Sequence, residues 1–166
     1  MKRLAALAPY ILRYRRKLIT GILAILGSVV VGLQGPRLVG SVIDSLRQHP
    51  SRGTLLAYAG LLVAIALVQG IFSYLQRMIL VGMSRDVEFD LRNDYFVSLE
   101  TKPAAFFHDH PTGDLMARAT NDLQAVRMVC GPAIMYSVNT VFTAAGALYF
   151  MTRIDPRLTL LALITM

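Results

Sequence analysis

One short segment of the chain carries the residue types that most often take part in chemistry. His108, Asp109 and His110 follow one another directly, and imidazole and carboxylate groups are common metal ligands. Metal sites usually need three or four ligands, and two histidines two positions apart on a turn lack the further ligands nearby in sequence. The sequence therefore predicts no metal site here.

The same segment offers two carboxylates, Asp109 and Asp114, which are candidates for acid–base catalysis. No third catalytic partner accompanies them. Asp114 would lie in the first turn of a new helix, where a negative charge suits the positive end of the helix dipole. Helix capping or docking therefore explains both residues better, and we predict no catalytic residues in this chain.

Helix-breaking residues surround these side chains. Pro103, Pro111 and Gly113 fall within eleven residues, after a run from 54 to 102 that contains no proline. Proline has no backbone N–H and disfavours helix for the residue before it, so a long upstream helix is expected to end here. Thr112 is then expected to cap a new helix with its hydroxyl group.

The result is a predicted tight reversal that presents two phenylalanines, Phe106 and Phe107. Either these rings pack on the neighbouring helices or they contact a partner protein, and the sequence leaves both readings open. Gly113 would let a partner approach the backbone closely. The predicted docking tip consists of Phe107, His108, Asp109, His110, Pro111, Thr112, Gly113, Asp114 and Leu115.

The composition is that of a membrane protein. Hydrophobic residues make up 55% of the chain and charged residues 16%, with a mean hydropathy of +0.53. Charged residues are absent from positions 18–36, 53–76 and 128–152, and each stretch is close to the 20 or so residues that cross a bilayer. Three such runs disfavour a soluble helical bundle, so we predict an all-α membrane protein.

The net charge of +7 is distributed as in a membrane protein rather than a nucleic-acid-binding one. Twelve of the 17 basic residues lie in the first 17 positions or between 77 and 127, whereas four lie in the other connections. Basic residues gather on the cytoplasmic side of membrane proteins. We therefore expect a multi-pass protein of the inner (plasma) membrane with a cytosolic N-terminus, and no nucleic-acid partner.

The first part of the chain is expected to enter the membrane from the inner surface. Residues 1–17 alternate apolar and basic residues, which is typical of an amphipathic helix whose Arg and Lys stems reach the lipid headgroups. A first span over 18–46 should kink at Pro36. A loop over 47–53, with Ser51 on the outer side, should follow.

The next two helices are expected to extend far beyond the bilayer. A helix over 54–102 would be about 70 Å long, and a returning span over 113–152 carries a similar apolar stripe. We predict an antiparallel pair with Leu91 and Leu123 buried between the helices. Residues 157–166 would begin a fourth span, and nine or so residues cannot cross a membrane, so we expect a fragment of a longer protein. The first stripe is Met83, Val87, Leu91, Tyr95 and Leu99.

These features together resemble the transmembrane domain of an ABC exporter. Residues 35–44 resemble the family's first-helix pattern of proline, glycine and a late aspartate, and residues 106–122 resemble its first coupling segment. The bacterial multidrug-type half-transporters are most similar. Further matches are Ser84-Arg85, Glu88, Leu91-Arg92-Asn93-Asp94, Val126-Arg127-Met128 and Gly131-Pro132.

The resemblance implies a partial type 1 transmembrane domain over 18–166, with six helices in a complete half and the segment 107–115 coupled to a nucleotide-binding domain. No Gly-x-x-x-x-Gly-Lys-Ser/Thr loop is present, so ATP and Mg²⁺ would be bound by a nucleotide-binding domain outside this sequence. The implied partners are that domain, a second half-transporter (identical or not), membrane lipid and a small lipophilic substrate.

Polar and aromatic residues of the third span are candidates for a substrate pathway, namely Tyr136, Asn139 and Phe142. Polar residues within a span tend to face protein or water, but packing between helices would explain them equally well. Two other functions stay open at this point. One is a receptor or sensor with a cytosolic helical hairpin, and the other is a structural helical scaffold.

Overall fold

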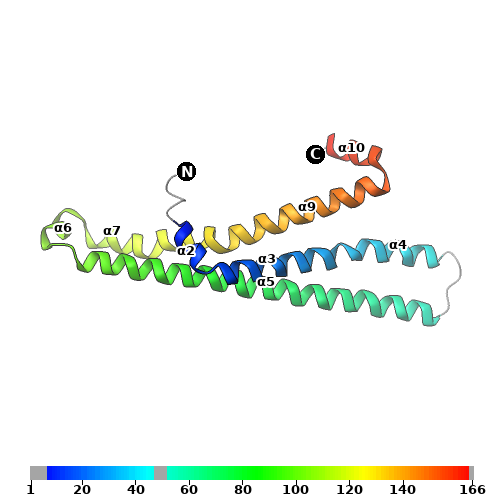
Figure 1. Ribbon diagram of the computed structural model, residues 1–166, viewed down its shortest axis with the longest axis horizontal. Coiled ribbons are helices and arrows are strands. Elements are labelled where there is room, and N and C mark those ends of the chain that lie inside the picture. Colours follow the sequence, from blue (N-terminus) through cyan, green and yellow to red (C-terminus); the bar gives the residue numbers. More distant parts are fainter. Residues whose placement is uncertain (1–6, 47–51, 165–166) are drawn as a thin grey trace. The chain divides into compact units, whose positions relative to one another are not determined.

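The computed structural model describes residues 7–46 and 52–164, and all regular secondary structure in this part is helical (Figure 1). The chain divides into two compact units that are best described separately. The first unit comprises Met1–Gly21 and Arg77–Tyr136, and the second comprises Ile22–Gln76 and Ser137–Met166.

The described part opens with a short helix, α2 (Ala8–Arg13), followed after Tyr14 by α3 (Arg15–Gly32). Pro9 stands in the first turn of α2, where its missing N–H costs no hydrogen bond. The predicted single helix over 1–17 is therefore interrupted at Tyr14, and residues 1–6 lie outside the described part. Because the axis is broken at Tyr14, α2 is a separate element from the apolar helix that follows.

The first span is also made of two helices, because α4 (Gln34–Leu46) succeeds α3 after a break at Leu33. The cause is Pro36. It has no N–H for the carbonyl four residues earlier, and its ring crowds that carbonyl. The carbonyl belongs to Gly32, which is the last residue of α3. The predicted kink thus lies one turn before the proline that produces it.

The longest element is α5 (Arg52–Glu100), a single helix of 49 residues that is unbroken in Figure 1. At 1.5 Å per residue it is about 74 Å long, more than twice the hydrocarbon thickness of a bilayer. Because α5 begins at Arg52, the predicted loop over 47–53 ends two residues earlier than expected. Residues 47–51, including Ser51, lie outside the described part.

After α5 the chain reverses through α6 (Ala104–Asp109) and then returns as one long helix. Thr112 is the first residue of that helix rather than its cap: Pro111 occupies the cap position, and no side chain caps the end. The predicted Thr112 cap is therefore wrong, because a prolyl residue already sets an extended backbone there. The returning helix consists of α7 (Thr112–Ala117), η1 (Arg118–Asp122), α8 (Leu123–Met128), η2 (Val129–Ala133) and α9 (Ile134–Ile154).

Two of these segments, η1 and η2, are π-helical turns. In a π-helix each backbone N–H bonds the carbonyl five residues earlier, whereas in an α-helix it bonds the carbonyl four residues earlier. Pro132 explains η2, since it cannot donate to an α-helical partner. No proline lies in η1. There the carbonyl of Ala119 accepts a hydrogen bond from the Nε of Arg92 on α5 at 3.3 Å.

The last helix of the described part is α10 (Pro156–Ile164). The Asp155 Oδ1 accepts the N–H of Arg157 at 2.8 Å, so this carboxylate satisfies a free amide at the start of α10. Within residues 7–46 and 52–164, three helices are long and apolar enough to cross a membrane. They are Arg15–Ser45, Arg52–Glu100 and Thr112–Ile154.

In the first unit, the apolar core lies where residues 77–100 of α5 meet residues 112–133 of the returning helix. We call this pair of segments the stalk. Its buried residues are Leu80, Met83, Ser84, Val87, Leu115, Ala119, Cys130 and Gly131.

The predicted burial of Leu91 and Leu123 is wrong, because both are only half-buried. The α5 stripe repeats every four residues, whereas an α-helix turns every 3.6, so the stripe drifts by about 40° at each step. Met83 and Val87 are fully enclosed, whereas Leu91, one step further along the stripe, is only half-buried.

Candidate functional site

At the end of the stalk, the tip (residues 107–115) exposes one of its two candidate phenylalanines. Phe106 is half-buried and stacks on the His110 ring, with centroids 4.2 Å apart and planes 13° from parallel. Phe107 meets Phe106 edge to face and remains 41% exposed. Phe106 therefore packs locally, and Phe107 is the ring that the tip presents.

Most polar residues of the tip are exposed, and His110 is half-buried against Phe106. His108 and Asp109 both lie on the surface, and the described residues contain no group of three side chains that could hold a metal ion. Asp114 pairs with Arg118 one turn later at 3.0 Å. Gly113 has no other part of the molecule within 4 Å of the position a side chain would take, so its backbone is open to a partner.

Leu115 differs from the other predicted tip residues because it belongs to the stalk. It is 6% exposed, and its carbonyl accepts a hydrogen bond from the Tyr95 hydroxyl group at 3.1 Å. This bond joins α5 to the first turn of the returning helix. Leu115 therefore fixes the tip to the stalk instead of forming its contact surface.

A charged network links the two stalk helices further along. The Nη2 of Arg92 donates to Glu88 at 2.6 Å, and the Nε of Arg127 lies 3.5 Å from the other oxygen of Glu88. Arg92 also holds the Ala119 carbonyl in the π-turn. The Glu88 side chain is 14% exposed, so its charge is largely enclosed between two guanidinium groups.

Gly131 and Gly21 allow the returning helix and α3 to pack closely against α5. A methyl group at Gly131 would lie 2.6 Å from the Ser84 side chain and 3.1 Å from the Leu80 carbonyl oxygen. Gly21 of α3 is covered by the Leu80 side chain, which is fully buried. Small residues at such contacts are typical of helices that pack in membranes.

The N-terminal helices are held on α5 by three aspartates spaced four residues apart, which we call the aspartate ladder. The hydrogen bond to Asp94 raises the pKa of the Tyr10 phenol above its ordinary value. Two of the basic residues expected to reach lipid headgroups thus have protein partners. The contacts are Tyr10–Asp94, Arg13–Asp90, Tyr14–Asp90 and Lys17–Asp86.

We expect Asp90→Ala to loosen α2 from α5, because the Asp90 carboxylate accepts two hydrogen bonds. One comes from the Arg13 guanidinium at 3.2 Å and the other from the Tyr14 hydroxyl group at 3.0 Å. Arg13 is 71% exposed, so water screens the Arg13–Asp90 ion pair. The free energy of unfolding should therefore fall by about 1 kcal/mol in total. Thermal unfolding in detergent measures it, and 1 M salt should shrink the difference. Asp122→Ala, at an exposed site, is the control, and an equal effect of the two changes would contradict the ladder.

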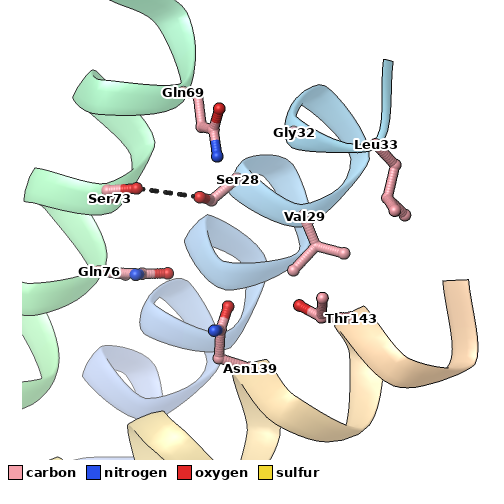
Figure 2. A pocket seen from close by; sticks show the side chains of 9 residues that line it. All are labelled: Ser28, Val29, Gly32, Leu33, Gln69, Ser73, Gln76, Asn139 and Thr143. Atoms are coloured by element: carbon pink, nitrogen blue, oxygen red, sulfur yellow. Dashed lines mark hydrogen bonds between the residues drawn. The ribbon is translucent and has the colours of Figure 1, made fainter. Parts of the chain in front are cut away.

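The second unit contains a polar pocket of about 390 Å³ (Figure 2). The hydroxyl groups of Ser28 and Ser73 are hydrogen-bonded at 3.0 Å, and the buried Oε1 of Gln76 has no hydrogen-bond partner within the described residues. The pocket contains no charged side chain. Its lining residues are Ser28, Val29, Gly32, Leu33, Gln69, Ser73, Gln76, Asn139 and Thr143.

Figure 2 shows that three helices contribute to this pocket: Ser28 comes from α3, Gln69 and Ser73 from α5, and Asn139 from α9. All three belong to segments apolar enough to span a membrane. An unpaired polar atom at that depth is unfavourable unless water or another polar group meets it. The arrangement thus suits a neutral molecule that carries hydrogen-bonding groups.

Comparison with known families identifies the architecture. The family model of the ABC transporter transmembrane region matches residues 18–166. The chain belongs to this family. The long helices and the reversal at the tip are therefore features of an ABC transporter transmembrane region.

Three curated relatives cover most of the chain. The multidrug resistance-like ATP-binding protein MdlA of Escherichia coli is 33% identical over the whole chain. The uncharacterized ABC transporter ATP-binding protein YfiC of Bacillus subtilis is 29% identical over 93% of it, and the probable multidrug resistance ABC transporter ATP-binding/permease protein YheI of the same organism is 33% identical over 84%. The chain spans between 24% and 28% of the length of these relatives.

Of the residues predicted for a substrate pathway in this ABC transporter transmembrane region, Asn139 lines the polar pocket. Tyr136 and Phe142 do not, and they are 58% and 38% exposed. Sequence reasoning missed the pocket's other polar residues. A signal was present in α5, where Gln69, Ser73 and Gln76 are spaced by four and three residues and so share one helix face.

Proposed function

We propose that this chain is the membrane part of an ATP-driven ABC exporter whose tip transmits motion from a nucleotide-binding domain to the membrane helices. The observation that carries the proposal is the exposed Phe107 on a tip that is fixed to two long helices. An exposed aromatic ring beside an unobstructed glycine backbone suits a docking surface.

The stalk is suited to carry such motion because both of its helices are tied together near the tip. Tyr95 holds the Leu115 carbonyl, and Arg92 holds the Ala119 carbonyl one turn further. A push on the tip therefore moves α5 and the returning helix as one body. The buried residues Met83 and Val87 continue this contact toward the apolar segments.

The described residues do not fit ATP or Mg²⁺. A phosphate-binding loop needs a strand, a glycine-rich turn and a helix, and the described residues form helices without a strand. We therefore place nucleotide binding and its Mg²⁺ in a separate nucleotide-binding domain. What this chain's residues supply is the docking tip and the path across the membrane.

The polar pocket supports a passage for small, uncharged or lipophilic molecules, with Asn139 facing it and Tyr136 and Phe142 as further contacts. A second half-transporter, identical or related, would complete the passage. We place the protein in the inner (plasma) membrane, surrounded by lipid and with its N-terminus in the cytosol, because twelve of the 17 basic residues lie in the first 17 positions or between 77 and 127.

The test is the response of ATP hydrolysis to substrate in the full-length transporter. Phe107→Ala removes the presented ring, and Gly113→Val blocks backbone approach. Each should reduce stimulation of ATPase activity by the lipophilic dye Hoechst 33342 in proteoliposomes, together with dye transport, by roughly tenfold. ATP binding should change little, since neither residue is expected to touch nucleotide.

Phe89→Ala is the matched control, because Phe89 is 70% exposed on α5 away from the tip. It should leave stimulation and transport at the level of the unmodified protein. If both tip variants behave like this control, the tip is a solvated turn and the coupling role is wrong.

A further inference from the structure

A second pocket lies in the same unit as the polar pocket but has the opposite character. It measures about 390 Å³ and is walled mainly by apolar side chains from α4, from α9 and from Leu33 in the break before α4. Two arginines, Arg37 and Arg153, also line it. The apolar residues that matter below are Leu33, Pro36, Ala147, Phe150 and Met151.

The two arginines are held in place without any carboxylate. The Arg37 guanidinium lies over the Phe150 ring, 3.9 Å from its centroid, and donates weakly to Gln34 at 3.5 Å. Arg153 contacts Tyr149, through its ring and through a 3.4 Å hydrogen bond to the hydroxyl group. Among the described residues, no ion pair involves either arginine.

Asp155 is occupied at the start of α10, where its Oδ1 accepts the Arg157 N–H. Within the described residues, the guanidinium groups of Arg37 and Arg153 thus border an apolar cavity without a carboxylate partner. Both side chains are exposed, so both guanidinium groups are open to an anion.

Both arginines lie near a membrane interface. Arg37 is twenty residues beyond Lys17, which corresponds to about 30 Å along the helices and matches the hydrocarbon thickness. Arg153 is the second-last residue of the spanning helix Thr112–Ile154. Phosphate groups and acyl chains meet in the headgroup region of a bilayer. The pocket offers arginines to the phosphate and apolar side chains to the acyl chain.

We propose that this arginine pocket binds an acidic phospholipid, with the lipid phosphate at Arg37 and Arg153 and an acyl chain along Leu33, Ala147 and Met151. Guanidinium groups pair with phosphate in a planar two-point geometry, and apolar walls within a spanning segment suit an acyl chain. This site shares only Leu33 with the residues that line the polar pocket, and it does not depend on the transport function proposed above.

The experiment uses the delipidated full-length transporter in a neutral detergent. Dioleoyl phosphatidylglycerol and dioleoyl phosphatidylcholine, which share their acyl chains, are titrated separately, and native mass spectrometry measures the lipid bound per chain. We expect preferential binding of phosphatidylglycerol. Because a basic residue near an acidic headgroup contributes about fivefold in affinity, Arg37→Gln with Arg153→Gln should weaken its binding by roughly 25-fold.

Three further arms make the result specific. Arg37→Lys with Arg153→Lys keeps the charge and should retain most of the preference. Arg157→Gln removes a neighbouring arginine that does not line the pocket and should leave binding unchanged. Soluble sn-glycerol 3-phosphate, which has the phosphate but no acyl chain, should not bind at concentrations that saturate the lipid.

Melting temperatures without added lipid show whether each variant is folded. If the double glutamine variant does not fold, Arg153→Gln alone should still lose about fivefold. The proposal is overturned if the unmodified protein binds both lipids equally, if the glutamine variants keep the preference, if Arg157→Gln abolishes it, or if glycerol phosphate binds as well as lipid.

Discussion

Replacing Gly131 by valine is expected to destabilise the protein by about 3 kcal/mol, the upper part of the range for an overfilled core. A side chain at Gly131 would lie 2.6 Å from Ser84 and 3.1 Å from the carbonyl oxygen of Leu80. The serine could turn away, but the carbonyl belongs to the backbone of α5 and cannot move without displacing the helix. The midpoint of thermal unfolding in detergent measures the loss.

A graded series makes this prediction sharp. Gly131→Ala should cost less than valine, because one methyl group displaces Ser84 without branching toward Leu80. Gly82→Ala is the matched control, since nothing lies within 4 Å of a side chain there, and it should stabilise α5 by about 0.5–1 kcal/mol. If valine at 131 were as stable as glycine, the close contact between the stalk helices would not exist.

The second large effect is expected at Glu88, whose replacement by leucine should destabilise the stalk by about 2 kcal/mol. Leucine leaves Arg92 and Arg127 facing each other without a counter-charge. Removing one partner from a fully buried pair costs about 3–5 kcal/mol, and the value is lower here because Arg92 is 40% and Arg127 is 26% exposed.

A double-mutant cycle separates this charge effect from packing. Arg127→Leu in the Glu88→Leu background should recover part of the stability, because it removes one of the two unpaired cations. The expected coupling energy is about 1 kcal/mol, read from chemical or thermal unfolding of the four proteins. Additive losses within about 0.3 kcal/mol would indicate that Glu88 and Arg127 act independently.

The sequence correctly predicted where helices end, break or continue. Each of these features is marked by a proline or by a stretch without proline. The lack of proline between 54 and 102 indicates the long α5, and Pro103 with Pro111 marks its end and the reversal. Pro36 indicates the break in the first span. Each of these acts on the backbone next to it, so no knowledge of the neighbouring helices is needed.

The antiparallel pairing of the stalk was predicted, but the particular residues that meet across different helices were not. The aspartate ladder requires Asp90 to face Tyr14, seventy-six positions earlier in the chain. The polar pocket requires Asn139 to face a segment sixty-three residues away, at Gln76. Residue spacing indicates which side chains share a face, but the partner of that face is decided by packing.

The π-turn at 118–122 sets the rotational phase of the returning helix. Its apolar residues Leu115, Ala119 and Leu123 are spaced by four, and a turn that holds an additional residue offsets the drift that such spacing produces.

A change in the length of the regular helix beyond this turn would therefore act as a rotation. Inserting one residue directly after Leu123, where α8 is ordinary α-helix, would turn everything beyond it by about 100° relative to the tip. Arg127 would then leave Glu88, and Gly131 would no longer face Ser84. The returning helix can tolerate many substitutions at these positions, because a substitution leaves the rotation of the helix unchanged. The number of residues between the tip and the membrane is fixed instead, because both ends of this helix must turn the correct face toward α5.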